Sequence, residues 1–378
     1  MGSWWDRFRQ FFGAAPPPPP RVSAPTPKPS APPATAPPSE RSGKYPSRPP
    51  LTVLPGGLDK ESPFDQLVAW LGLSLPDRLV LTQADLDADE ALAARALEHF
   101  RKNRPAPSSL PAVSLQVLNA IAEPDLSLSE LSRLVAQDPA LAAGVLKVAN
   151  SPAYMGAQEI QTLRDAVTRL GLTEVGRVAG MVAARSLFQP QVRSEFATFG
   201  AKWSELFTDS VTAARGSAWL SMRLRKGRSD HVFVAGMLHD LGRPVALRSI
   251  AALAMGGESI DAHRVDRVIE QVHVEVGGEV HQAWSLPRFP TLVAMRHHDL
   301  NLPADGEYVD VHVVRLVSAL IQFRRSPWRF ETIRNEVNQS CAALGVDAFV
   351  LRSLDTQLKD EQTHVGHSFS DKGRRRTG

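Results

Sequence analysis

The sequence predicts an all-α protein, on three observations. From Leu51 onward, apolar residues recur at three- and four-residue spacing, which places them on one face of a helix. Residues typical of helix starts and ends stand at the borders of several of these stretches. No region alternates apolar and polar residues for long enough to build a sheet. We therefore expect a helical N-terminal lobe followed by a helical bundle.

Composition bounds the class of protein. The chain has 378 residues, of which 43% are hydrophobic, enough for one large domain or two ordinary ones. Its single cysteine, Cys341, cannot form an internal disulfide, which favours a reducing compartment. The sequence has neither a run of 18 apolar residues nor the order of a secretory signal. We expect a cytoplasmic protein, with recruitment to a membrane or polar complex as an option.

Positive charge is concentrated at the two ends of the chain. Residues 1–50 carry seven Lys or Arg and two acids, a charge of +5, and the tail from Ser368 carries +3. Because the whole chain has a net charge of +3, the middle, 51–367, is left with −5. Domains that bind the phosphate backbone of nucleic acids carry clustered positive charge, whereas residues 51–367 are mildly acidic. We therefore do not expect this part of the chain to bind nucleic acid.

The first fifty residues divide into a head and a spacer. Residues 14–50 hold fifteen of the thirty prolines, a composition that favours an extended, disordered linker. Residues 1–13 form a short head with aromatic residues at roughly helical spacing and Arg7 and Arg9 between them. The aromatic residues are Trp4, Trp5, Phe8, Phe11 and Phe12. We predict that this head docks into a partner groove or onto a membrane surface, and the alternative is that it packs back on its own domain.

Helical patterns follow in order. Asp65–Gly72 and Asp89–Arg101 belong to a small helical extension over 51–108, which Pro105 and Pro107 end. Ser127 with Glu130 reads as a capping box, and Asp138 before Pro139 reads as an N-cap with a first-turn proline.

The remaining helices are expected over the ranges that follow, with Gly171 as a C-terminal cap. They are 139–149, 165–170, 173–187, 201–224, 231–241, 264–284, 288–298, 310–323 and 347–358. Residues 359–378, with Arg374–Arg376, are expected to be a basic disordered tail.

Histidines and a carboxylate mark the candidate site. His239 and Asp240 close an otherwise apolar helix, His273 follows on a later helix, and His297–His298 form a pair. Such side chains suit transition metals or zinc when several helices converge. From spacing alone they could equally be helix caps and core hydrogen-bonding groups.

The order of motifs resembles the HDOD branch of the HD superfamily of phosphohydrolases. The motifs are LPAVSLQVLNAI, AQDPALAAGVLKVANSPAYMG, L-x-x-A-V-x-x-LG at Leu163–Gly171, AGMLHDLGR, HVEVGGEVHQAWSLP and RHHD. The resemblance covers roughly residues 108–325. It implies an all-helical domain, here assigned to 109–358, with an N-terminal lobe leading into an HD-like bundle.

The resemblance also implies roles for single residues. His239, Asp240, His273, His297 and His298 match metal ligands of the HD pattern. We call Asp240, His273, His297 and His298 the second metal position. In the parent family the first metal position combines the His-Asp pair with two further ligands. Asp209 and Ser318 stand in the place of those two, so we expect an incomplete site that holds at most one divalent ion (Fe, Mn or Zn).

The branch that hydrolyses cyclic-di-GMP, HD-GYP, is a useful contrast. There a Gly-Tyr-Pro motif closely follows the His-His pair, whereas this chain continues HHDLNLPADGEY. The resemblance therefore does not extend to that substrate.

Three functional hypotheses follow. The first is a non-catalytic signalling protein that acts by binding protein partners. The second is a metal-dependent phosphohydrolase acting on a nucleotide or cyclic dinucleotide. The third, compatible with the first, is a localisation adaptor addressed by its head. Trp203, Trp219 and Trp284 are interpreted as packing residues and Cys341 as a buried small residue.

Overall fold

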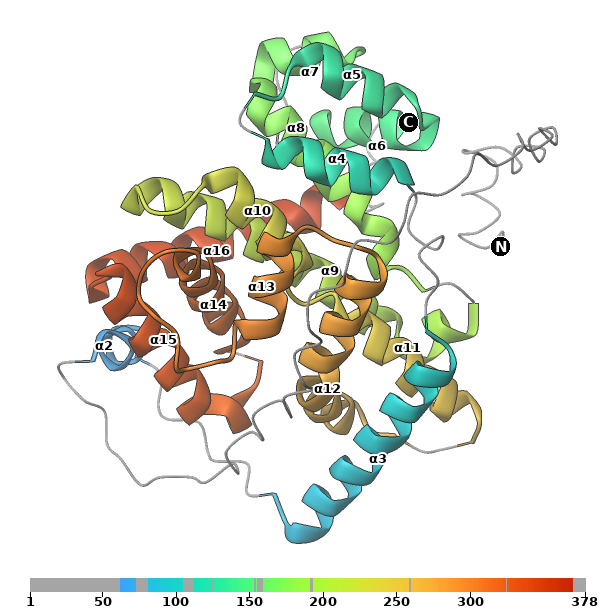
Figure 1. Cartoon of the computed structure of the whole chain (residues 1–378), viewed down its shortest axis with the longest axis vertical. Coiled ribbons are helices and arrows are strands. Elements are labelled where there is room, and N and C mark those ends of the chain that lie inside the picture. Colours follow the sequence, from blue (N-terminus) through green and yellow to red (C-terminus); the bar gives the residue numbers. More distant parts are fainter. Residues whose placement is uncertain are drawn as a thin grey trace, which may run out of the picture. The chain divides into compact units, whose positions relative to one another are not determined.

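The computed structural model describes residues 62–72, 81–104, 112–123, 125–152, 154, 159–190, 193–257, 260–323 and 325–369. Within these ranges the chain is helical and contains no strand, which confirms the all-α prediction (Figure 1). The predicted head (1–13), spacer (14–50) and the end of the tail (370–378) lie outside the described residues.

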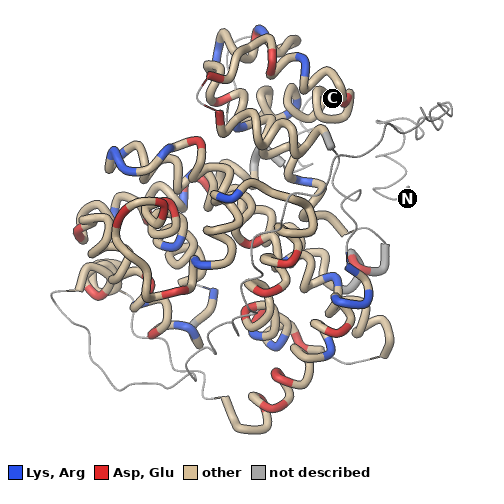
Figure 2. The backbone as a smooth tube through the Cα atoms, in the orientation of Figure 1, with Lys and Arg blue, Asp and Glu red and all other residues tan. Residues whose placement is uncertain are grey.

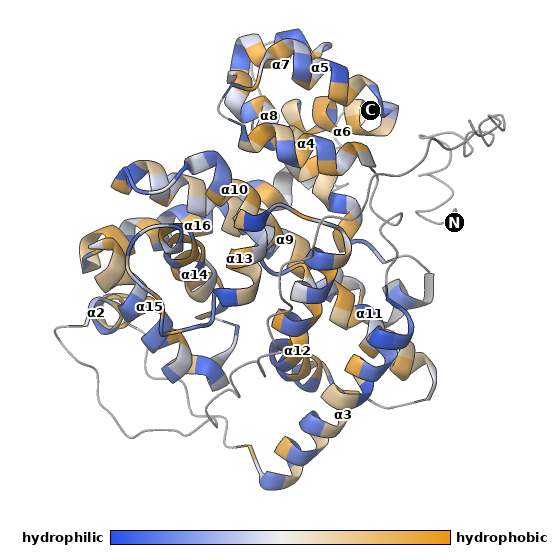
Figure 3. Ribbon diagram, viewed as in Figure 1, coloured by the Kyte–Doolittle hydropathy of each residue, from blue (hydrophilic) through white to orange (hydrophobic). Residues whose placement is uncertain are grey.

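The N-terminal lobe consists of five short helices. They are α4 (Ala112–Ala122), α5 (Leu128–Ala136), α6 (Pro139–Ala149), α7 (Leu163–Leu170) and α8 (Leu172–Ala184). The N-caps are confirmed: the Ser127 hydroxyl accepts from Glu130 N, and the Asp138 carboxylate accepts from Ala140 N at 2.8 Å. Of the predicted capping box, only this Ser127 half is formed. Gly171 separates α7 from α8 with φ of 82°, a conformation that favours glycine. In Figure 3 apolar colour follows one side of these helices.

The bundle that follows is built around α9 (Arg193–Leu224), which bends at Phe199. It continues with α10 (Ser229–Leu238), α11 (Gly242–Met255), α12 (Ala262–Ala283), α13 (Arg288–Arg296), α14 (Tyr308–Phe323), α15 (Phe330–Leu344) and α16 (Ala348–Phe369). Helix α10 lies directly on α9, since a Cβ on Gly236 would sit 2.8 Å from Ala213 O. A glycine at position 236 therefore allows this close packing of the two helices.

Helices α2 (Pro63–Trp70) and α3 (Gln83–Lys102) are part of the bundle's packing. The buried carboxylate of Asp65 pairs with Arg334 on α15. The buried carboxylate of Asp89 accepts from Arg264 and Arg267 on α12, each at 3.0 Å. The region predicted as a helical extension therefore fastens to two different faces of the bundle.

The helix predictions differ from the structure in two ways. Helices α4, α11 and α15 have no counterpart among the expected helix ranges. The last helix, expected to end at Leu358, continues to Phe369. It continues because Val365 is buried and Glu361 pairs with Arg215 on α9, so the predicted tail begins at least eleven residues too early.

The packing roles of the large residues are confirmed. Trp203 and Trp284 are buried, and Trp219 packs half-buried against the core. Cys341 is buried as well, and burial raises the pKa of its thiol to about 12. None of the helices among the described residues is long and apolar enough to cross a membrane.

Candidate metal centre

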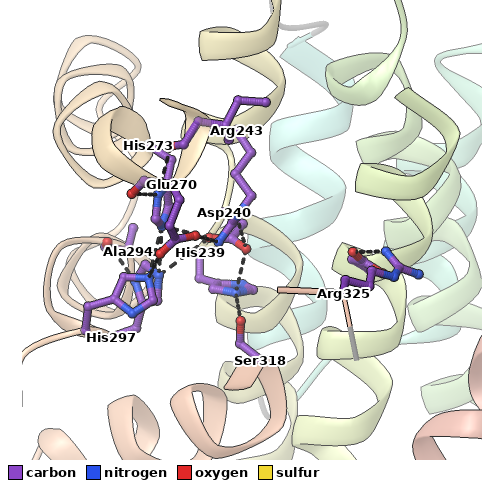
Figure 4. Close-up of polar contacts among 12 residues, drawn as sticks. His239, Asp240, Arg243, Glu270, His273, Ala294, His297, Ser318 and Arg325 are labelled. Atoms are coloured by element: carbon purple, nitrogen blue, oxygen red, sulfur yellow. Dashed lines mark hydrogen bonds and ion pairs between the residues drawn. The ribbon is translucent and has the colours of Figure 1, made fainter. Parts of the chain in front are cut away.

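The His-Asp pair lies at the junction of α10 and α11, pressed against α12. Helix α10 ends at Leu238, His239 is its C-cap, and α11 begins at Gly242. A Cβ on Gly242 would lie 1.9 Å from the carbonyl oxygen of His273, so only glycine permits this approach of the two backbones. The junction thereby brings Asp240 within reach of the α12 and α13 histidines (Figure 4).

Three histidine rings are held by their own backbones. Nδ1 of His239 donates to Gly236 O at 2.8 Å, Nδ1 of His273 to Glu270 O at 3.0 Å, and Nδ1 of His297 to Ala294 O at 3.0 Å. Since a carbonyl oxygen only accepts, Nδ1 must carry the proton in each ring. In a neutral ring Nε2 then carries no proton, so its lone pair is free to bind a metal ion, as it does in metal-ligating histidines.

The Nε2 atoms converge on one oxygen of Asp240. Oδ1 lies 3.5 Å from Nε2 of His273 and 3.5 Å from Nε2 of His297. Nε2 of His273 lies 3.4 Å from Nε2 of His297 and 3.1 Å from Nε2 of His298. Ligands about 2.1 Å from a tetrahedral ion are about 3.4 Å from one another. The second metal position therefore has the donor types and the spacing that suit one divalent ion.

The first metal position differs, because its donor atoms are engaged by the protein. Nε2 of His239 lies 3.0 Å from the hydroxyl of Ser318, and Asp240 Oδ2 accepts from Arg243 Nε at 2.6 Å. Asp209 pairs with Arg325 and belongs to no metal-competent group of His, Cys, Asp or Glu among the described residues, although His239, Asp240 and His297 form such a group. Figure 4 shows Arg325 well apart from the histidines.

A chain of alternating charges surrounds the second metal position. Arg243 Nη2 donates to Glu270 at 2.7 Å, Arg329 Nη1 forms an ion pair with Glu270 at 3.0 Å, and Arg329 Nη2 donates to Glu336 at 3.0 Å. Nδ1 of His298 lies 2.7 Å from Glu336 Oε1. Both arginines and both glutamates are buried, so their charges are compensated inside the protein.

Sequence reasoning missed these four residues. Glu270 had a usable signal, since it stands three residues before His273 and therefore on the same helix face. Arg243 directly follows the HDLG motif. Arg329 and Glu336 carry no signal, because their role depends on how distant helices pack.

The electrostatics favour neutral rings and a charged aspartate. Burial and the nearby Arg243 hold the pKa of His273 well below its usual value, and burial lowers the pKa of His297. Burial would raise the pKa of Asp240, but Arg243 and His239 outweigh it and the pKa falls well below its usual range. Burial raises the pKa of Asp209 to about 7, although Arg325 favours its charged form.

All five histidine and aspartate residues of the sequence prediction therefore meet in one place, and the two substituted positions are tied to other partners. An all-helical chain with a His-Asp junction facing histidines from two further helices has the architecture expected of an HD-type domain. Residues 108–300 match the HDOD domain family. The chain belongs to the HDOD family.

The chain is also similar to individual known proteins. An uncharacterized protein of Treponema pallidum is 27% identical over 240 residues, 59% of this chain and 44% of that protein. The chain thus spans less than half the length of that relative. The crystal structure of an HDOD domain protein of unknown function from Geobacter sulfurreducens has a TM-score of 0.55 at 23% identity, covering 74% of this chain and 99% of that one. A protein of Marinobacter aquaeolei named for signal transduction has a TM-score of 0.49 at 19% identity, over 84% and 66% of the two chains.

Proposed function

We propose that this protein is a non-catalytic HDOD regulator that acts in a signalling pathway by binding protein partners. One observation carries the proposal: the donor atoms of the first metal position are engaged by Ser318, Arg243 and Arg325. Hydrolysis by paired metals needs two adjacent ions that clamp the attacking and leaving oxygens. With the first position closed in this way, the site would lack that clamp.

Internal charge compensation supports the same conclusion. Arg243 and Arg329 supply two positive charges to the buried Asp240, Glu270 and Glu336. Such a buried, paired network needs no external cation to satisfy most of its carboxylates. The HD-like centre would then act as a structural core of the regulator.

A second candidate function is a metal-dependent phosphohydrolase that uses the second metal position alone. It is favoured by the spacing of Asp240 Oδ1 and the Nε2 atoms of His273 and His297. A divalent ion (Fe, Mn or Zn) bound there would polarise a phosphate and lower the pKa of a bound water. Asp240 and the three histidines would hold it, and Glu336 would orient His298 through Nδ1.

Metal analysis and a phosphodiesterase assay separate the two functions. The purified full chain is analysed for bound metal and then assayed with a cyclic dinucleotide in the presence of Mn²⁺ or Fe²⁺. The proposed function predicts no turnover above background, with His297→Ala equal to the wild type. Near-stoichiometric metal with turnover that is lost in His297→Ala and kept in the exposed control His263→Ala would overturn it.

The head belongs to the same proposal. Residues 1–13, with the aromatic side chains named above, would direct the domain to its partner or to a membrane surface. An affinity pull-down with the full chain and with residues 1–13 deleted tests this role. Equal recovery of partners by the two forms, together with unchanged localisation of a fluorescent fusion, would remove the head from the proposal.

A further inference from the structure

The end of α9 and the turn that follows it, residues 222–228, gather exposed positive charge. We call it the basic turn. Its cationic residues are Arg223, Arg225, Lys226 and Arg228, all exposed. Figure 2 shows them as a blue group at the end of α9. Within the described part of the chain, the guanidinium groups of Arg223 and Arg225 form no ion pair.

The basic turn is held from several sides. The Ser221 hydroxyl donates to Lys226 O at 2.7 Å, Lys226 Nζ donates to Leu344 O at 2.8 Å, and Arg228 Nη2 donates to Ala122 O at 3.0 Å. Arg225 adopts φ of 53°, a strained conformation for a residue with a side chain. Strain of this kind persists where surrounding contacts impose it, and it is frequent at ligand-binding positions. The basic turn is therefore preorganised.

Three carboxylates lie near the turn, and within the described part of the chain none of them forms an ion pair with Arg223 or Arg225. Asp230 pairs with Arg177 at 3.3 Å. Asp310 lies beneath the turn, since a Cβ on Gly227 would sit 2.6 Å from Asp310 Oδ1. Asp347 accepts from Val350 N at 2.8 Å and caps α16. Asp310 interacts with the charge of Arg228, whereas the guanidinium groups of Arg223 and Arg225 form no ion pair with a carboxylate among the described residues.

Two exposed apolar side chains belong to the segments that meet at the basic turn. Met222, at the start of the basic turn, is 53% exposed. Lys226 fastens the turn to the α15–α16 turn at Leu344, and Phe349, five residues further along, is 68% exposed. Large apolar side chains this exposed are few among the described residues. Arginine, methionine and aromatic residues are the side chains most enriched at protein interfaces.

We propose that the basic turn, with Met222 and Phe349, binds a short acidic segment of a partner protein that also carries apolar side chains. The guanidinium group of arginine binds a carboxylate with two parallel hydrogen bonds. The flexible side chain of methionine packs against apolar partners of varied shape. A long polyanion such as nucleic acid would face the charge of −5 on residues 51–367. This inference rests on the proposed function, because it names the surface through which the regulator would contact its partner.

Fluorescence anisotropy with the full chain tests the surface. The probe is a short labelled peptide of alternating glutamate and leucine-rich segments, compared with the same peptide carrying lysine for glutamate. We expect salt-sensitive binding of the acidic peptide, weakened about tenfold in Arg223→Glu/Arg225→Glu and also weakened in Phe349→Ser. Arg288→Glu, at an exposed arginine on α13, is the matched control and should bind as the wild type does.

The decisive measurement exchanges the charges on the protein and on the peptide. The Arg223→Glu/Arg225→Glu variant should prefer the lysine peptide over the acidic one, reversing the wild-type order. Acidic-peptide binding that is absent, or unchanged in the double variant, would overturn the proposal. So would tighter binding to phosphatidylglycerol vesicles or to a single-stranded oligonucleotide than to the peptide. Turnover in the phosphodiesterase assay would contradict the proposed function without affecting this binding measurement, so the two failures are distinguishable.

Discussion

Arg243 and Asp240 form a buried ion pair, 2.6 Å from Nε to Oδ2, at the start of α11. The same guanidinium reaches Glu270 on α12 at 2.7 Å. One cation therefore compensates two carboxylates from different helices, at the point where α10, α11 and α12 meet. The pair belongs as much to the stability of the fold as to the chemistry of the site.

Replacing Arg243 should destabilise the protein strongly. Arg243→Met would leave Asp240 and Glu270 buried with less compensation, which typically costs about 3–5 kcal/mol. Chemical denaturation of the full chain measures the free energy of unfolding. Arg104→Met, at an exposed arginine paired with Glu279, is the control and should change stability by less than about 1 kcal/mol. Equal effects of the two substitutions would show that the buried pair has no special role.

The approach of α11 to α12 makes a second prediction. Gly242→Ala would push a methyl group into the carbonyl of His273, so it should lower the free energy of unfolding by more than about 2 kcal/mol. Gly366→Ala, on the exposed face of α16 with no atom within 4 Å of the new Cβ, should raise it by about 0.5–1 kcal/mol. Thermal unfolding of both variants checks the opposite signs, and a tolerated Gly242→Ala would contradict the close backbone contact.

These contacts also show why sequence reasoning reached only part of the fold. Helices α5 and α6 were predicted because Ser127 and Asp138 are side-chain caps. Helices α11 and α15 begin without a hydrogen bond from a side-chain cap. Their starts are set by packing against other helices, which leaves no local pattern.

The candidate site also contains residues that the sequence predicts and residues that it does not. His239, Asp240, His273, His297 and His298 could be predicted, because motif order identifies them. Their mutual distances could not, since these depend on Gly242 and on the carbonyl acceptors of three helices. Arg329 and Glu336 reach the site from the segment after α14, where no motif marks them.

The end of α16 makes a third prediction. Glu361 pairs with Arg215, which also binds Glu174 in the N-terminal lobe. Glu361→Gln should therefore destabilise the protein by about 1–3 kcal/mol, because a half-buried guanidinium loses one of its two carboxylates. Asp360→Asn, one residue earlier and exposed, is the matched control and should leave stability within about 0.5 kcal/mol. Hydrogen exchange adds a second readout: Glu361→Gln should speed exchange in α8 as well as in α16. Faster exchange in α16 alone would separate this helix from the lobe.

His281 makes a pH-dependent prediction. Its Nε2 lies 3.1 Å from Leu238 O and its Nδ1 lies 3.2 Å from Thr291 Oγ1, in a fully buried position. Burial lowers its pKa to about 4 from an ordinary value of 6.5. Between these values the unfolded chain binds a proton at this ring that the folded chain does not. The contribution of His281 to stability is therefore complete above about pH 6.5 and is lost as the pH falls toward 4, by about 3 kcal/mol in all.

The test compares slopes, because other buried histidines titrate in the same range. Urea denaturation is repeated between neutral pH and about pH 4.5 for the wild type and for His281→Gln, whose amide can still donate to Leu238 O but does not titrate. At neutral pH the variant should be less stable than the wild type. As the pH falls, its free energy of unfolding should decrease less steeply than that of the wild type, with slopes that differ by up to about 1.4 kcal/mol per pH unit. His263→Gln, at an exposed histidine on α12, should follow the wild-type slope. Parallel curves for wild type and His281→Gln would mean that the pKa of this ring is the same in the folded and the unfolded chain, which would contradict the prediction.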